Sequence, residues 1–291
     1  MKFKYVIIKK YDGLSLIQFF NEFNLGKPKI HNIFNDKKLL VNGSFENRNY
    51  VLKENDILEI EYDESRDFEV LSRKLDVVYE DDYLLIVNKP SNILVHPDDK
   101  AKNGTMVNVV SYYYQNKGLD LSIKYAHRLD IDTTGLLIFV KDSLTKAKID
   151  SLISTHELKR YYLCLVEGKL KNKKGTINAP IGMDRHHKQR RRISNTDQEA
   201  ITHYEVLKEF KKYSLVKVIL ETGRTHQIRV HMASIGHPLL GDELYGCKIE
   251  GYKRFMLHSH EVDFIHPITG ERINVIKKLP FDMDKLVKEE K

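Results

Sequence analysis

An uninterrupted apolar run at residues 135–140 constrains the fold of this chain more than any other feature of its sequence. The run, Gly-Leu-Leu-Ile-Phe-Val, contains no polar side chain, which is typical of a short β-strand buried on both faces. Other strand-like segments surround it, whereas candidate helices are fewer. We expect helices at 106–115, at 144–153 behind an N-cap at Asp142 or Ser143, and from an N-cap at Thr225 to about 235. This order predicts an α+β fold with a mixed, mainly antiparallel sheet.

The first 62 residues have the pattern of a small α+β module of their own. The expected elements are a strand at 4–10, helices at 14–23 and 29–34, and strands at 39–43 and 57–62. Charged residues dominate 63–74, a composition that suits a linker. The sequence therefore divides into a module at 1–62, a linker at 63–74 and a larger domain at 75–291.

Composition narrows the partners and the compartment. The formal net charge of +7 and the pI of about 9.0 favour a polyanionic partner without proving one. The two cysteines, Cys164 and Cys247, are far apart in the sequence and belong to no CxxC pair, which argues against a disulfide framework or a cysteine-rich zinc site. No apolar run approaches the roughly 20 residues of a membrane span, and the N-terminus lacks the pattern of a signal peptide. We therefore expect a cytoplasmic protein.

Two polar segments adjoin predicted elements closely enough to form a site. Residues 126–134, Ala-His-Arg-Leu-Asp-Ile-Asp-Thr-Thr, precede the apolar strand at once, and a buried strand would hold them rigidly. Taken alone, His127 and Asp130 suit a simple structural turn equally well. In residues 220–232, two arginines and two histidines surround a predicted helix N-terminus, which favours an anion. A solvated first turn is the plainer interpretation of that segment.

A third segment, residues 185–192, is strongly basic. Its sequence, RHHKQRRR, has five Lys or Arg, two His and no acidic residue. No apolar period runs through it, so we expect a loop rather than a packed element. Such loops typically contact phosphates, although a merely solvated run of charge has the same composition.

Five ordered blocks between about residues 75 and 280 resemble the pseudouridine synthases of the RluA-like family. They are DVVYEDDYLLIVNKPSNILVHP at 76–97, AHRLDIDTTGLLIFVKD at 126–142, KRYYLCLVEG at 159–168, LETGRTHQIRVHMASIGHPLLGDELYG at 220–246 and MLHSHEVDFIHPITGE at 256–271. The module at 1–62 is similar to a small RNA-binding module first seen in a ribosomal small-subunit protein. Among the departures from the family pattern, Asn92 stands where glycine is usual, and Thr134 where serine is usual. Asparagine tolerates positive φ and threonine keeps the hydroxyl, so we expect little effect.

The resemblance implies an RNA pseudouridine synthase that needs no metal and no cofactor. It implies Asp130 as the essential carboxylate, Tyr162 as the aromatic partner on a strand, and Arg229 as the cation that keeps the carboxylate ionised. Tyr161 should then face the opposite side of the strand. The RNA-binding residues that we expect are Arg128, Arg185, Lys188, Arg190, Arg191, Arg192, Arg224, Lys27, Lys29 and Lys37. Large-subunit ribosomal RNA is the favoured substrate, transfer RNA is the alternative, and a monomer is expected.

Two functions of other classes stay open at this point. A metal-dependent phosphoesterase would draw on His127, Asp130, Asp132, His226 and His231, but their spacing fits no standard zinc motif. A non-catalytic RNA-binding or ribosome-assembly protein would use the module and the basic segment equally well. The intact set of Asp130, Tyr162 and Arg229 argues against this second alternative.

Overall fold

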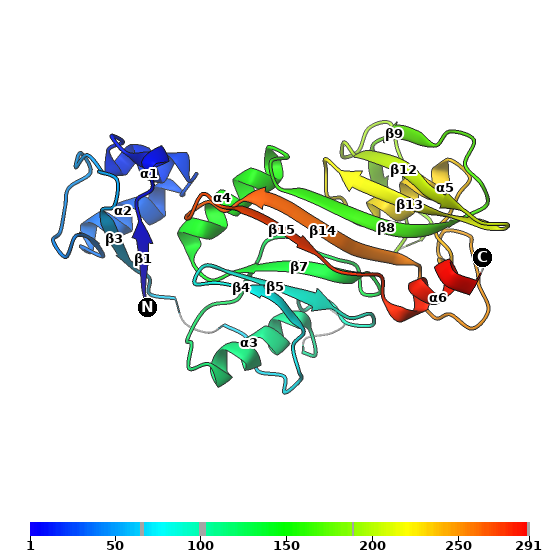
Figure 1. Ribbon diagram of the computed structural model, residues 1–291, viewed down its shortest axis with the longest axis horizontal. Coiled ribbons are helices and arrows are strands. Elements are labelled where there is room, and N and C mark those ends of the chain that lie inside the picture. The colour runs from blue at the N-terminus through cyan, green and yellow to red at the C-terminus, as the bar shows by residue number, and fades with distance from the viewer. Residues whose placement is uncertain (65–66, 99–102, 188, 290–291) are drawn as a thin grey trace.

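The sheet predicted for the larger domain is present in the computed structural model, which describes residues 1–64, 67–98, 103–187 and 189–289. Ten strands follow the order β4-β5-β7-β14-β8-β13-β12-β9, with β15 beside β14 and β6 beside β7 (Figure 1). β7 and β14 pair in parallel and the other neighbours pair antiparallel, so the predicted mixed, mainly antiparallel α+β fold is confirmed. The strands are β4 (Val77–Glu80), β5 (Leu84–Lys89), β6 (Lys124–Tyr125), β7 (Thr134–Val140), β8 (Lys159–Glu167), β9 (Lys174–Asn178), β12 (Ile201–Glu209), β13 (Tyr213–Leu220), β14 (Leu257–Ile265) and β15 (Arg272–Ile276). The helices of this domain are α3 (Met106–Asn116), α4 (Ser143–Ser154), α5 (Gln227–Ser234) and α6 (Phe281–Glu289).

The apolar run forms β7, and every side chain of this strand is buried, as predicted. Leu137 and Phe139 join a core with Val107 of α3. Leu136 joins a second core on the other face with Ile149 of α4. Because the strand separates two cores, any polar group at its entrance is held between fixed layers.

Gly135 lets β14 approach the start of β7 more closely than a side chain would permit. Its φ is +106°, and an added Cβ would lie 2.1 Å from the carbonyl oxygen of Ser259. The two residues are directly opposite each other in the parallel pair. The entrance of β7 is therefore fixed against β14.

The basic segment differs from the predicted loop. Its last residues belong to β11 (Arg191–Ile193), which pairs antiparallel with β10 (Ile181–Met183) in a separate two-stranded sheet. Ile181 and Ile193 lie opposite each other and pack in one apolar cluster. These two strands form a hairpin, residues 181–193, which we call the basic hairpin. One apolar residue on each strand anchors it. A single apolar residue per strand gives no recognisable period, which is why the sequence predicted a loop.

The first 62 residues contain a three-stranded sheet and two α-helices. The sheet has the order β1 (Lys2–Val6), β3 (Ile57–Glu61), β2 (Leu39–Val41), and the helices are α1 (Leu16–Glu22) and α2 (Lys27–Asn35). The strand predicted at 4–10 ends at Val6, and a 3₁₀ turn, η1 (Lys9–Tyr11), follows. Ser15 and Gln18 form a capping box that starts α1. The apolar core of this part also includes Leu144 and Ile268, which belong to the larger domain.

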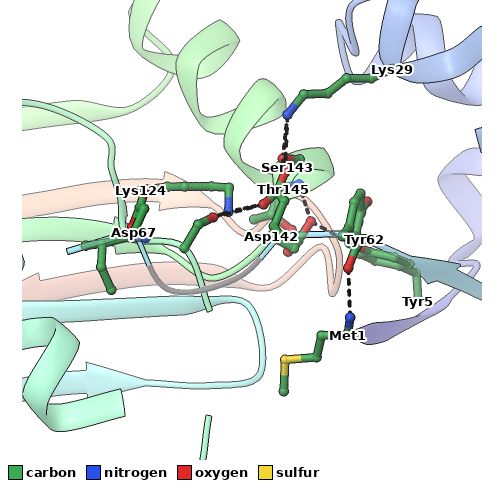
Figure 2. A network of polar contacts seen from close by, with 12 residues as sticks. Met1, Tyr5, Lys29, Tyr62, Asp67, Lys124, Asp142, Ser143 and Thr145 are labelled. Atoms are coloured by element: carbon green, nitrogen blue, oxygen red, sulfur yellow. Dashed lines mark hydrogen bonds and ion pairs between the residues drawn. The ribbon is translucent and has the colours of Figure 1, made fainter. Parts of the chain in front are cut away.

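Polar contacts fasten this part of the chain to the first turn of α4 (Figure 2). The Tyr5 hydroxyl donates to Asp142 Oδ1 over 2.8 Å and lies 3.1 Å from the Tyr62 hydroxyl. The same Asp142 oxygen accepts from the Thr145 amide at 2.9 Å, which confirms Asp142 as the N-cap of α4. Lys29 Nζ donates to Ser143 Oγ over 2.7 Å. The N-terminus of α4 is therefore both a helix cap and an attachment point.

The described residues of the charged segment 63–74 also pack on their surroundings. Asp67 accepts from the Ile123 amide at 3.0 Å, and the Leu71 amide donates to the carbonyl of Asn108 in α3 at 3.0 Å. Among the helices that the structure describes, none is long and apolar enough to cross a membrane.

Candidate active site

Asp130, Tyr162 and Arg229 line one pocket, although they are up to 99 positions apart in the sequence. Asp130 lies in the turn that leads into β7, Tyr162 on β8, and Arg229 in the first turn of α5. β14 pairs with both β7 and β8, so the sheet itself sets the spacing of the first two. Arg128 and Arg224 line the same pocket and are exposed.

Arg229 is shared between two carboxylates. Its Nη1 lies 3.4 Å from Asp130 Oδ2, whereas its Nε and Nη2 make a bidentate pair with Asp242 at 2.7 and 2.9 Å. The guanidinium lies over the rings of Phe255 and Tyr245, with its carbon 4.1 and 5.0 Å from their centroids. Burial opposes the charge, but the hydrogen bonds that Arg229 donates to Asp242 raise the pKa of Arg229 above its usual value. The expected pairing with Asp130 is thus the longer of two, and sequence analysis did not identify Asp242.

Tyr162 is buried, and its neighbour lies on the other face of the strand. Burial raises the pKa of Tyr162 above its usual value, so the hydroxyl keeps its proton at neutral pH. Tyr161 is half-buried, with Lys217 Nζ 4.1 Å from its ring centroid. The alternation expected of a strand places only the second tyrosine in the pocket.

The start of α5 differs from the sequence prediction. The residue before the helix is His226, not Thr225, and it adopts a left-handed conformation with φ of +60°. Among the described residues, no side chain caps the helix, and the side chain of Gln227 accepts from the Arg224 amide in the preceding turn at 2.9 Å. His226 lines the pocket, with its Nε2 4.0 Å from Asp130 Oδ2.

Lys89, at the end of β5, supports the turn that carries Asp130. Its Nζ is buried and donates to the carbonyls of Ile131 at 2.8 Å and Pro90 at 2.9 Å. Burial lowers the pKa of Lys89 to about 7. The lysine stands in the first resembling block, but a lone lysine at a strand end carries no signal that it contacts a turn 42 positions away.

The two departures from the family pattern behave as expected. Asn92 has φ of +59°, a conformation that asparagine tolerates in place of glycine. The hydroxyl of Thr134 lies 2.9 Å from His258 Nδ1, so threonine supplies the polar atom of a serine.

The other predicted RNA-binding residues are divided between two regions. Arg185 and Arg190 are exposed on the basic hairpin, and Arg191 and Arg192 are half-buried there, whereas Lys188 lies outside the described residues. Lys27 and Lys37 are exposed on the N-terminal part, and Lys29 contacts Ser143 at the attachment point. The structure therefore brings Arg128, Arg224 and the hairpin near the pocket, as α5 contacts β11, and leaves the module lysines apart from it.

Of the residues in the metal-site alternative, Asp130 and His226 meet in the pocket, with Oδ2 and Nε2 4.0 Å apart. Among residues 1–64, 67–98, 103–187 and 189–289, no group of three or more His, Cys, Asp or Glu is arranged to hold a metal ion. His231 uses both ring nitrogens within the fold, one 2.8 Å from the Thr202 hydroxyl and the other 2.9 Å from the Ala179 carbonyl.

Comparison with known proteins is consistent with this geometry. Residues 83–234 match the sequence model of the family described as RNA pseudouridylate synthase. The chain is 41% identical over 286 residues to an uncharacterized RNA pseudouridine synthase of Bacillus subtilis, YhcT, covering 97% of this chain and 95% of that protein. It is 35% identical over 245 residues to ribosomal large subunit pseudouridine synthase D of Haemophilus influenzae, covering 79% and 75%. The solved structure of human RNA pseudouridylate synthase domain containing 4 has the same fold, with a TM-score of 0.59, 22% identity, and coverage of 72% of this chain and 90% of that one.

Proposed function

Since the chain belongs to the RNA pseudouridylate synthase family and isomerises uridine to pseudouridine in RNA, we propose that Asp130 is its catalytic carboxylate and large-subunit ribosomal RNA its substrate. The observation that carries the first part is the position of Asp130 in a pocket beside Arg229 and Tyr162. The second part is supported by relatives named as ribosomal large subunit pseudouridine synthases, 35% identical to this chain. The cytoplasm, where bacterial ribosomes are assembled, is the compartment that this substrate implies.

The reaction needs a group that stabilises the positive charge that develops on the ribose. It breaks the bond between C1′ of the ribose and N1 of uracil, joins C1′ to C5 instead, and moves the proton of C5 to N1. The reaction is an isomerisation and needs no external oxidant or reductant. A carboxylate at the ribose stabilises the charge that develops on C1′, and Arg229 holds Asp130 in its charged form and in one orientation.

Tyr162 suits a stacking role better than a proton-removing one. Its buried hydroxyl keeps its proton, which makes it a poor base, whereas its ring offers an aromatic face for uracil. The uridine has to leave its own stack to reach the pocket. Arg128, exposed at the rim, is our candidate to fill the vacated position.

The RNA-binding proposal joins the rim of the pocket to the basic hairpin. Arg224 and the hairpin arginines are suited to the phosphates that flank the uridine, and Lys27 and Lys37 to more distant phosphates. We also propose that the protein is a monomer, which light scattering of the protein with and without RNA would measure.

Asp130→Asn tests the catalytic assignment, because it keeps the shape of the side chain and removes its charge. We expect folding and RNA affinity to be unchanged and pseudouridine formation to fall to background. The matched control is Asp132→Asn, two residues away and not among the residues that line the pocket. Activity above a few per cent in the first variant, or an equal loss in the control, would remove Asp130 from the catalytic role.

Mapping of pseudouridine in total RNA tests the substrate. In a strain that lacks this protein we expect pseudouridine to disappear from large-subunit ribosomal RNA, and to return with the wild-type gene but not with Asp130→Asn. Loss confined to transfer RNA would overturn the ribosomal assignment and leave the chemistry intact.

A further inference from the structure

The hydroxyl of Tyr245 lies between the basic hairpin and the pocket. The backbone amide of Arg191, in β11, donates to it over 2.8 Å. His226 Nδ1 lies 3.0 Å from the same oxygen, and the two rings meet edge to face at 89°. Tyr245 is buried and also covers Arg229. One oxygen atom thus contacts both the RNA-binding hairpin and a residue of the pocket.

These contacts select one tautomer of His226. An amide N–H can only donate, so Arg191 occupies a lone pair of the phenol oxygen. If His226 Nδ1–H donated to the same oxygen as well, the buried phenol hydrogen would have no acceptor between these two contacts, which favours a hydroxyl that donates to His226. His226 Nδ1 lies in position to accept it. Burial lowers the pKa of His226, so its ring is neutral and carries a single N–H. A ring that accepts at Nδ1 carries its hydrogen at Nε2.

The Nε2 atom of His226 lies on the side of the ring that is nearest to Asp130, and both residues line the pocket. It lies 4.0 Å from Asp130 Oδ2, too far for a hydrogen bond, so it stays open to a nucleotide beside the carboxylate. The left-handed backbone of His226, φ +60°, is uncommon for a residue other than glycine and directs the ring to this position.

We propose that His226 is a further hydrogen-bond donor to the reacting nucleotide, and that Tyr245 is a positioning residue that fixes its donor tautomer through the backbone of Arg191. This inference rests on the proposed function of the pocket. When the bond between C1′ and N1 breaks, the electron pair stays on uracil, and a preorganised N–H donor stabilises that charge. The hairpin that contacts RNA and the donor that meets the uracil are then linked by one hydroxyl group.

Two substitutions at His226 separate the donor from the backbone. Asparagine tolerates the left-handed conformation but is too short to reach the Nε2 position, whereas the amide of glutamine reaches it. Single-turnover rates and dissociation constants are measured on one RNA. We expect His226→Asn to lower the rate about 100-fold, the effect of losing one preorganised donor, with affinity within about threefold of wild type. His226→Gln should recover at least a tenth of the wild-type rate. Equal rates for wild type and His226→Asn, or no recovery with glutamine, would overturn the donor role.

A double-mutant cycle tests whether Tyr245 acts through His226. Tyr245→Phe keeps the ring over Arg229 and removes only the hydroxyl, so we expect a roughly tenfold slower rate with unchanged affinity. In the His226→Asn background the same change should have no further effect. Two effects that multiply would show that Tyr245 acts independently. The control is Tyr213→Phe, which removes a hydroxyl bonded to the Leu286 carbonyl outside the pocket and should leave the rate unchanged.

The tautomer itself is measurable in the wild-type protein, which keeps the inference testable if a variant fails to fold. Ring ¹⁵N shifts of His226 should show a proton on Nε2, and Tyr245→Phe should reduce that preference. A wild-type proton on Nδ1 would overturn the inference. Wild type serves as the check on the proposed function: absence of pseudouridine with wild type contradicts that function, whereas active wild type with unaffected His226→Asn contradicts only this inference.

Discussion

At the scale of the residue, the site depends on one buried arginine that two carboxylates share. Arg229 binds Asp242 through two short bonds and Asp130 through one longer contact. Asp242 anchors the guanidinium. Asp130 therefore has a fixed cation beside it, while its oxygens are not both engaged in a short ion pair. In the mechanism that we propose, Asp130 thereby keeps room for the nucleotide.

Asp242→Asn is expected to unfold the site as well as to slow it. The variant leaves a buried arginine with a single distant partner, a change that costs about 3–5 kcal/mol in comparable buried pairs. Urea denaturation measures the loss, and single-turnover rates should fall with it. The control is Asp263→Asn, which breaks a bidentate pair of the same geometry with Arg272, a residue on the surface. Equal losses of stability in the two variants would contradict this account of Arg229.

Lys89 gives a prediction about pH. Its pKa is about 7 in the folded protein against an ordinary value of 10.5, so between these values the unfolded chain binds more protons than the native one. Stability from this group therefore rises with pH across that window, by at most about 1.4 kcal/mol per pH unit. Lys89→Met lacks the titration, so the stability of wild type relative to this variant should grow from pH 7 to 10. A constant difference would show that the amine stays charged in the fold.

At the scale of the element, the basic hairpin is the part that sequence analysis described least well. Arg191 and Arg192 lie in a strand where a loop was expected. The Arg191 amide contacts the Tyr245 hydroxyl, and the charged side chains of the hairpin belong to the RNA-binding surface that we propose. The main chain of Arg191 and its charged side chain therefore have different roles in this proposal.

Replacing Arg190, Arg191 and Arg192 with alanine separates those tasks. The substitutions remove charge and keep the Arg191 amide, so RNA binding should weaken while the rate in the bound complex changes little. Each lost phosphate contact should reduce the slope of log affinity against log salt by about 0.7 to 0.9. Alanine at Lys278, Lys285 and Lys288, in and next to α6, removes the same charge elsewhere. An equal change of slope in that control would mean that total charge, not the hairpin, governs binding.

The success of sequence analysis at this scale follows from the range of the interactions. β7 and the cap of α4 depend on residues within a few positions, and both were predicted correctly. The hairpin depends on Ile181 meeting Ile193, and the site depends on Asp242 meeting Arg229, contacts that no local pattern encodes. Asp130, Tyr162 and Arg229 were identified through family resemblance rather than through any local rule.

At the scale of the whole molecule, the N-terminal part and the larger domain meet at the first turn of α4. Asp142 caps that helix and accepts from Tyr5 (Figure 2). Leu144 and Ile268 extend the same contact into the apolar core. Figure 1 shows the N-terminal part at one end of the long axis, with α6 toward the other. The contact is thus a packed interface with a buried carboxylate in it.

The buried carboxylate predicts an unusual dependence on pH. Burial raises the pKa of Asp142 above its usual value. At a pH between the usual and the raised pKa, the native state therefore holds a proton that the unfolded chain has lost. Its contribution to stability therefore falls as pH rises from about 4, the usual pKa of an aspartate, through the raised value. Asparagine keeps the cap, so the stability of Asp142→Asn relative to wild type should increase with pH in thermal melts.

Asp56 supplies the control of opposite sign. Burial raises its pKa, but bonds from the Lys53 amide, Asn42 and Tyr50 outweigh burial and lower it overall. The stability of wild type relative to Asp56→Asn should therefore increase as the pH rises. Slopes of the same sign in the two variants would contradict the assignment for Asp142.

Because of the interface at α4, the segment between the two parts, residues 63–74, does not set how far apart they lie. Contacts of Tyr5, Lys29 and Leu144 hold the two parts together. The separation between the module lysines and the pocket is therefore set by this packed interface and not by the length of segment 63–74. Residues added to segment 63–74 would lengthen the path along the backbone and leave that separation as it is. The reach of the RNA-binding surface that we propose would therefore be altered by a change in the first turn of α4, and not by a change in the length of the connection.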